Sequence, residues 1–222
     1  MQQIPTGARA HAVLTDPTFV VPPVPAAPVP PRGMGWLRAS VARFSTGEPH
    51  RRRRALAVAL LDAAPPASLR GEPGEHPVVV LARALRVDAP VELIADVAQA
   101  YQPGTGDEAR ADAAVDRLVA LGGSYDEAAA ARIGVLVQAC TATADLVERA
   151  RHASVDEVLR DDPPVRATKR LPRSPARVGG LHVEAGEVVL VGLAGDLAFG
   201  AGPHRCPGRA HALALVEALS SR

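Results

Sequence analysis

The chain has 222 residues, enough for one substantial hydrophobic core or two small ones. Its 25 basic and 24 acidic residues give a formal net charge of +1, so no global field would draw it to nucleic acid or to an anionic membrane. The two cysteines, Cys140 and Cys206, lie in unrelated contexts, which argues against a disulfide framework. The N-terminus does not look like a secretory signal and no apolar run is long enough to cross a bilayer, so the sequence predicts a soluble, cytoplasmic protein.

The N-terminal region is rich in proline. Residues 21–31, "VPPVPAAPVPP", carry too many prolines for a helix or a strand ladder and predict an extended, polyproline-like segment. We therefore expect a Pro-rich N-terminal segment over residues 1–35 and a single domain over residues 36–222.

Helical patterns dominate the middle of the chain. Apolar periodicity and the breaks "QPGTG" and "LGG" predict helices over 36–64, 77–87, 90–101 and 107–121. The longest pattern runs over 125–150, where one side of the helix carries Ile133, Leu136, Val137, Cys140 and Val147. This segment is the best candidate for a buried central helix, with Cys140 as a small buried residue.

The pattern changes after residue 150. Ser154 followed by Glu157 predicts a capping box for a short helix, which Pro163 and Pro164 then end. The stretch "ARVGGLHVEAGEVVLVGL" alternates apolar residues around a Gly-Gly turn and predicts a small β-hairpin. The fold class is therefore mainly α with a minor β portion.

The stretch "FGAGPHRCPG", residues 199–208, surrounds one cysteine with glycines. A thiolate is a strong soft ligand for iron and needs hydrogen-bond donors near the sulfur, which backbone amides supply only in a tightly turned loop. Glycines at 200, 202 and 208 permit such turns. The loop resembles the haem-binding loop of the cytochrome P450 family, whose pattern is filled by Phe199, Gly200, Gly202, His204, Cys206 and Gly208.

Taken alone, the loop has a simpler interpretation. A Gly-rich segment with one cysteine is usually a turn with a buried thiol, whereas a zinc site would need more cysteine and histidine ligands than this stretch offers.

Three further stretches resemble the same family, in the family's order. "EVLR", from Glu157 to Arg160, is similar to its Glu-x-x-Arg helix, in which the two side chains share one helix face and can pair. Arg170, in "KRLPRSP", stands where the family has an arginine that binds a haem propionate. His50 and Arg54, one helical turn apart in "PHRRRR", match a histidine and an arginine of the family that hold a propionate. The arginine run could also be a nucleic-acid patch or a solvated face, and we expect Arg51 and Arg52 to be solvated.

The helix at 125–150 resembles the family's distal helix, which carries an acid followed by a threonine for proton delivery. This chain has Thr141 in the place of the acid and Ala142 in the place of the threonine, so Thr141 and Thr143 are the candidate hydroxyls. The chain is also short for the family, since the long helix leads almost directly into the helix of Glu157.

The resemblance implies a reduced cytochrome P450-like haem-thiolate fold that binds haem b, with Cys206 as the axial ligand of the iron. It implies propionate contacts from His50, Arg54, Arg170 and His204, and structural roles for Glu157 and Arg160. The leading function is monooxygenation of a small organic substrate, with electrons from a ferredoxin-type partner that docks near Arg205 and Arg209. Two alternatives stay open: a haem protein that no longer activates oxygen, such as a sensor, a peroxide-using enzyme or a helper protein, and a degenerate fragment without haem.

Overall fold

The computed structural model describes residues 1–24 and 30–220. Part of the expected Pro-rich segment, residues 25–29, lies outside the described residues. The chain divides into two compact units, each built from two separate stretches. We call Met1–Pro23 with Arg149–Cys206 the sheet unit, and Val24–Glu148 with Pro207–Arg222 the helical unit.

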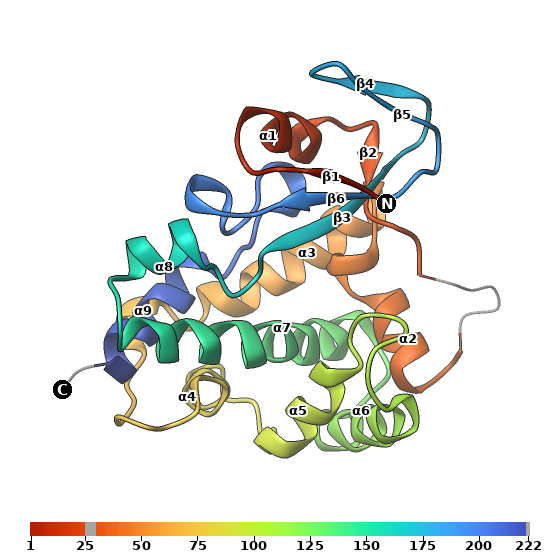
Figure 1. Cartoon of the computed structure of the whole chain (residues 1–222). Coiled ribbons are helices and arrows are strands. Elements are labelled where there is room, and N and C mark those ends of the chain that lie inside the picture. The colour runs from red at the N-terminus through yellow and green to blue at the C-terminus, as the bar shows by residue number, and fades with distance from the viewer. Residues whose placement is uncertain (25–29, 221–222) are drawn as a thin grey trace. The chain divides into compact units, whose positions relative to one another are not determined.

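The sheet unit contains a four-stranded sheet in the order β1-β6-β3-β2 (Figure 1). β1 pairs parallel with β6, whereas β6 with β3 and β3 with β2 pair antiparallel. Helix α1 contacts β6 beside this sheet. The elements of the unit are β1 (Gln2–Ile4), α1 (Ala8–Thr15), β2 (Phe19–Val20), α8 (Val155–Asp161), β3 (Ala167–Pro172), β4 (Ala176–Val178), β5 (Leu181–Val183) and β6 (Val189–Gly192).

The core of the sheet unit follows from the period-two pattern of its strands. In β6, Val189 and Val191 are fully buried while Leu190 between them is half-buried. They pack with Ile4 of β1 and with Val13 and Leu14 of α1 in one apolar cluster. This burial anchors the chain that leads from β6 into the loop around Cys206.

The predicted hairpin and capping box are both confirmed. β4 and β5 pair antiparallel across Gly179 and Gly180, which both have positive φ, as a tight two-residue hairpin turn requires. The Ser154 side chain accepts from the Glu157 backbone, and the Glu157 carboxylate accepts from the Ser154 backbone, at the start of α8.

The helical unit confirms the predicted helices with one correction. The expected helix over 36–64 is broken, because Val41, Ser45 and Thr46 are extended and Gly47 has φ of +63°. The helices of the unit are α2 (Gly33–Ser40), α3 (Gly47–Asp62), α4 (Pro77–Ala84), α5 (Val91–Gln99), α6 (Glu108–Gly122), α7 (Glu127–Ala150, whose last two residues fall in the sheet unit) and α9 (Arg209–Ser220).

Helix α7 is the predicted long central helix (Figure 1). All five residues expected on its inner side, Cys140 included, are buried. Within the described residues, α7 is also the one helix long and apolar enough to cross a bilayer by length and composition, which corrects the expectation that the chain has no such run. Half of that apolar window is buried inside the protein, as in the core helix of a globular unit.

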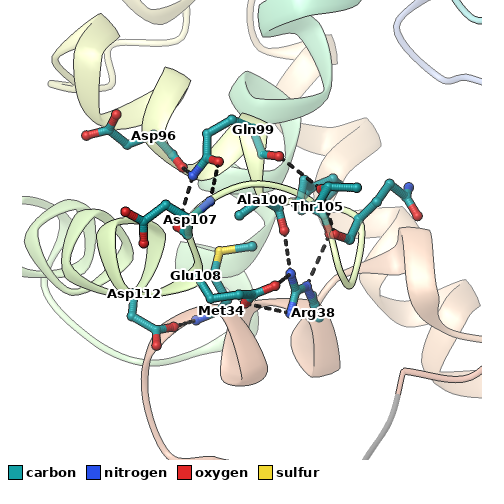
Figure 2. Close-up of polar contacts among 11 residues, drawn as sticks. Met34, Arg38, Asp96, Gln99, Ala100, Thr105, Asp107, Glu108 and Asp112 are labelled. Carbon is teal, nitrogen blue, oxygen red and sulfur yellow. Dashed lines mark hydrogen bonds and ion pairs between the residues drawn. The ribbon is translucent and has the colours of Figure 1, made fainter.

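A buried arginine joins three helices of this unit, and no local sequence pattern predicts its contacts. Arg38 of α2 has a side chain only 8% exposed, and its Nη2 lies 2.7 Å from Glu108 Oε1 of α6. Its Nε donates to the Tyr101 carbonyl at 3.1 Å and its Nη2 donates to the Ala100 carbonyl, just after α5 (Figure 2). The guanidinium therefore satisfies carbonyls beyond a helix end that would otherwise be buried without partners.

Candidate functional site

The loop of residues 199–206 follows β6 and is closed by its own backbone. The Cys206 amide donates to the Phe199 carbonyl at 2.9 Å, and the Gly200 amide donates to the Leu197 carbonyl at 2.8 Å. Cys206 is exposed and Phe199 is half-buried. Gly208 follows in the turn directly before α9, the helix predicted to begin there. The loop thus presents a thiol on a backbone that local hydrogen bonds hold in shape.

Of the three glycines predicted to permit the turns of this loop, Gly200 and Gly202 have positive φ, whereas Gly208 does not. Gly200 has φ of +71° and Gly202 has φ of +65°, in the left-handed region that other residues enter at a cost. Gly202 also packs directly on α1: a Cβ there would lie 2.3 Å from the Leu14 carbonyl oxygen. The loop therefore rests on α1, which contributes nothing to the sequence motif.

Arg170 is buried in β3, opposite Val189 of β6. Its Nη1 donates to Thr168 Oγ1 at 3.0 Å and to the Lys169 carbonyl at 2.8 Å, so the guanidinium is held by its own strand. Together with Arg170, four other predicted cofactor-binding residues belong to the sheet unit: Phe199, Gly200, His204 and Cys206.

The remaining predicted residues belong to the helical unit. His50 and Arg54 lie one turn apart on α3, with His50 buried and Arg54 half-buried. Arg51 and Arg52 are exposed, as expected. The run of four arginines also has a structural role. The Nε atoms of Arg52 and Arg53 each lie 2.8 Å from a carboxylate oxygen of Glu127 at the start of α7. These ion pairs and hydrogen bonds lower the pKa of Glu127 to about 2.

The two candidate threonines lie on opposite sides of α7. At 3.6 residues per turn, positions 141 and 143 are separated by about 200° around the helix axis. Thr143 lies on the buried side with Leu136, Cys140 and Val147, whereas Thr141 is exposed. The two hydroxyls cannot serve one site together, and Thr141 is the accessible one.

Cys140 is a buried core residue, as predicted. Burial raises the pKa of its thiol, as expected for an inert core cysteine.

The expected pair between Glu157 and Arg160 is wrong. Both residues are exposed, and Glu157 is occupied by the capping box. Arg160 instead forks onto the carboxylate of Asp161, at 3.0 Å and 3.1 Å. Hydrogen bonds from Ser154 lower the pKa of Glu157, which fits its role as a helix cap. The spacing of Glu157 and Arg160 alone did not show that Ser154 would bind the Glu157 carboxylate and that Asp161 would bind the Arg160 guanidinium.

The residues around Cys206 fit a haem better than a metal ion bound by the protein alone. In the part of the chain that the structure describes, no three His, Cys, Asp or Glu side chains are gathered to hold a metal. A haem iron needs only an axial ligand from the protein, because the porphyrin supplies the others. An exposed cysteine on a glycine-shaped loop, with Arg170 and His204 in the same unit, is a donor set suited to a thiolate-bound haem with carboxylate edges.

Comparison with known proteins gives matches at the level of structure. No family model and no curated protein matches the sequence. P450BioI, solved in complex with an acyl carrier protein ligated by hexadec-9Z-enoic acid, matches with a TM-score of 0.65 at 17% identity, over 94% of this chain and 80% of that chain. P450 RauA, complexed with a biosynthetic intermediate of aurachin RE, matches with a TM-score of 0.65 at 18% identity, over 98% and 82%. CYP109E1 from Bacillus megaterium, in complex with testosterone, matches with a TM-score of 0.64 at 16% identity, over 97% and 81%.

The chain therefore has the cytochrome P450 fold, mainly α with a minor β portion. Within that class it is a 222-residue chain similar to the P450 structures named above. The resemblance inferred from loop 199–208 is confirmed at the level of fold.

Proposed function

We propose that the chain binds haem b through Cys206 and acts as a haem-thiolate oxidoreductase, with monooxygenation of a small organic substrate as its reaction. The observation that carries this proposal is the exposed Cys206 on a loop closed by the hydrogen bond to Phe199 and shaped by Gly200 and Gly202. The P450 fold supports it. A cytoplasmic location is part of the same proposal.

Each predicted residue has a role that follows from its chemistry. Cys206 supplies the thiolate, and the backbone around Gly200 and Gly208 lets the chain approach a flat ligand closely. Phe199 gives an aromatic side chain beside the sulfur. The four basic side chains hold the propionates through charge-assisted hydrogen bonds: His50, Arg54, Arg170 and His204. When bound, the haem supplies the redox-active iron at which this class of enzyme activates oxygen.

Proton supply falls to Thr141 in this proposal. Its exposed hydroxyl on α7 can hold a water and pass a proton, whereas the hydroxyl of Thr143 is buried on the other side of the helix. The electron donor is a ferredoxin-type protein, docked by basic residues that include Arg205 and Arg209. The acyl carrier protein of the P450BioI complex is a partner of that protein, and a small free substrate remains the proposal here.

The second candidate is a haem protein that does not use electrons from NADPH to activate oxygen. It is favoured by the helix α7 itself, where Thr141 replaces the family's acid and Ala142 replaces its threonine. A single hydroxyl without a neighbouring acid is a weaker proton relay, so oxygen reduction would be slow or uncoupled. Such a protein would use peroxide, or would sense or assist without turnover.

The two functions are separated by the electron source. Purified holoprotein is supplied with NADPH, a ferredoxin and its reductase, or with hydrogen peroxide alone, and product is measured from a panel of small substrates. NADPH-driven product that falls in Thr141→Val, but not in the matched Thr143→Val, supports the monooxygenase. Product with peroxide alone, unaffected by Thr141→Val, supports the second function. A chain that takes up no haem rules out both.

A further inference from the structure

The helical unit contains a second candidate site, a cavity of about 310 Å³. It is lined by the connection between α4 and α5, by α5 and α6, and by the first half of α7. Its apolar wall is formed by side chains that are almost fully buried: Ile94, Leu118, Ile133 and Leu136. The volume lies at the lower end of the range for small-molecule pockets.

This cavity uses a different face of α7 from Thr141. Its α7 residues Ala129, Arg132, Ile133 and Leu136 recur at the spacing of one helix face. Thr141 lies five residues after Leu136, which places it about 140° further around the helix. The cavity is therefore independent of the residues proposed for oxygen chemistry.

The rim of the cavity carries two guanidinium groups and one carboxylate. Arg132 is half-buried, and its Nη2 is held by the Gly122 carbonyl at 3.2 Å. Arg86 is exposed, and among the described residues its guanidinium makes no hydrogen bond or ion pair. Asp88 is the single acidic lining residue, so the lining carries a net charge of +1. An anionic group would complement this rim.

Arg86 also occupies an unusual backbone position. The Val87 amide donates to the Ala82 carbonyl and the Arg86 amide to the Arg83 carbonyl, which is the Schellman pattern at the end of α4. The residue directly after the C-cap of such a motif, here Arg86 with φ of +55°, takes a left-handed conformation, and glycine is the residue favoured there. The chain keeps an arginine at a position where glycine would be less strained, and that arginine lines the cavity.

We propose that this cavity binds a small amphipathic carboxylate, with its acyl chain against Ile94, Leu118 and Leu136 and its carboxylate held by Arg86 and Arg132. Burial of the acyl chain supplies the affinity. The two guanidinium groups supply preference for an anion over a neutral or cationic head group. The proposal does not depend on haem binding.

The test is calorimetric titration of the full chain with octanoate, octan-1-ol and octylamine. Octanoate is expected to bind at least tenfold more tightly than the other two, and Arg86→Gln and Arg132→Gln are each expected to weaken it about tenfold. Arg117→Gln, an exposed arginine of α6 outside the cavity, is the matched control and leaves the affinity unchanged. Ala89→Trp, which narrows the cavity from the α4–α5 connection, is expected to abolish binding.

Three results of the titrations overturn the proposal, and a fourth that involves Cys206 also does. The three are no binding of octanoate at millimolar concentration, equal binding of octanoate and octan-1-ol, or an octanoate affinity that Arg86→Gln and Arg117→Gln change alike. Binding lost in Cys206→Ala but kept in Arg86→Gln would place the ligand at the haem site and also contradict it. Circular dichroism confirms that each variant is folded before it is titrated.

Discussion

The backbone amide of Cys206 donates to the carbonyl of Phe199 at 2.9 Å, which joins the two ends of the loop of residues 199–206. The shape of the loop is thus set by the chain itself. A thiolate offered from a preformed loop loses less conformational freedom on binding than one on a mobile segment.

The contact between Gly202 and α1 makes the first prediction. Gly202→Ala is expected to lower the free energy of unfolding by about 3 kcal/mol or more, because a Cβ would meet the Leu14 carbonyl at 2.3 Å and the residue has positive φ. Gly195→Ala is the control, with φ of +57° and open space around the added Cβ, and should cost about 1 kcal/mol. Urea unfolding of both variants measures the difference; equal losses would mean that the contact with α1 is unimportant.

Arg170 provides a test of propionate binding. Arg170→Gln is expected to weaken haem binding about tenfold, since it removes a charge-assisted hydrogen bond to a carboxylate. The exposed Arg177 of β4 supplies the matched variant, Arg177→Gln, which should bind haem as the wild type does. Titration of the apoprotein with haemin gives the affinities. If both variants bind alike, Arg170 does not hold a propionate and its hydrogen bonds to Thr168 and Lys169 have a structural role.

The buried Arg38 network predicts a large loss of stability. Arg38→Ala should cost about 3 kcal/mol or more, because it leaves the carbonyls of Ala100 and Tyr101 without this donor. The control also joins α5 to α6: Arg110 pairs with Asp96 at 2.7 Å but is 65% exposed, so Arg110→Ala should lower the free energy of unfolding far less than Arg38→Ala does. Chemical denaturation distinguishes the two, and a similar cost for both would contradict the structural role of Arg38.

Glu127 predicts a pH dependence of stability. Its pKa is about 2 in the folded protein against an ordinary value of 4.5, so its stabilisation is present above pH 4.5 and is lost as the pH falls toward 2. At pH 6 the free energy of unfolding of the wild type should exceed that of Glu127→Gln by roughly 1–2 kcal/mol, after allowance for solvent screening at the half-exposed Arg52. Unfolding curves from pH 6 to pH 3 measure the gap. If the difference in free energy of unfolding between the wild type and Glu127→Gln stays constant over this pH range, Arg52 and Arg53 do not hold the Glu127 carboxylate in solution.

The sequence predicted most helices because their apolar periodicity is local. The same holds for the hairpin at Gly179 and Gly180 and for the capping box of Ser154, since each is specified within a few residues. Arg38 was missed because its partners lie 62 to 70 residues away in sequence, at positions no local pattern marks.

The loop around Cys206 was predictable in part, because some of its features are specified within a few residues. The positive φ of Gly200 and Gly202 follows from the residue type, whereas the contact of Gly202 with Leu14 joins distant parts of the chain. The pairing of Glu157 with Arg160 was wrong because spacing does not reveal which nearby groups compete for a charge. The opposition of Thr141 and Thr143 could have been derived from helix geometry alone.

The central claim is that Cys206 is the thiolate ligand of a haem, and the carbon monoxide difference spectrum of the dithionite-reduced protein tests it most directly. Wild type and Cys140→Ala, which removes the buried cysteine of α7, are expected to show a Soret band shifted far to the red. Cys206→Ala is expected to lose that band. An unshifted band in the wild type, or a red-shifted band that survives in Cys206→Ala, would contradict the assignment.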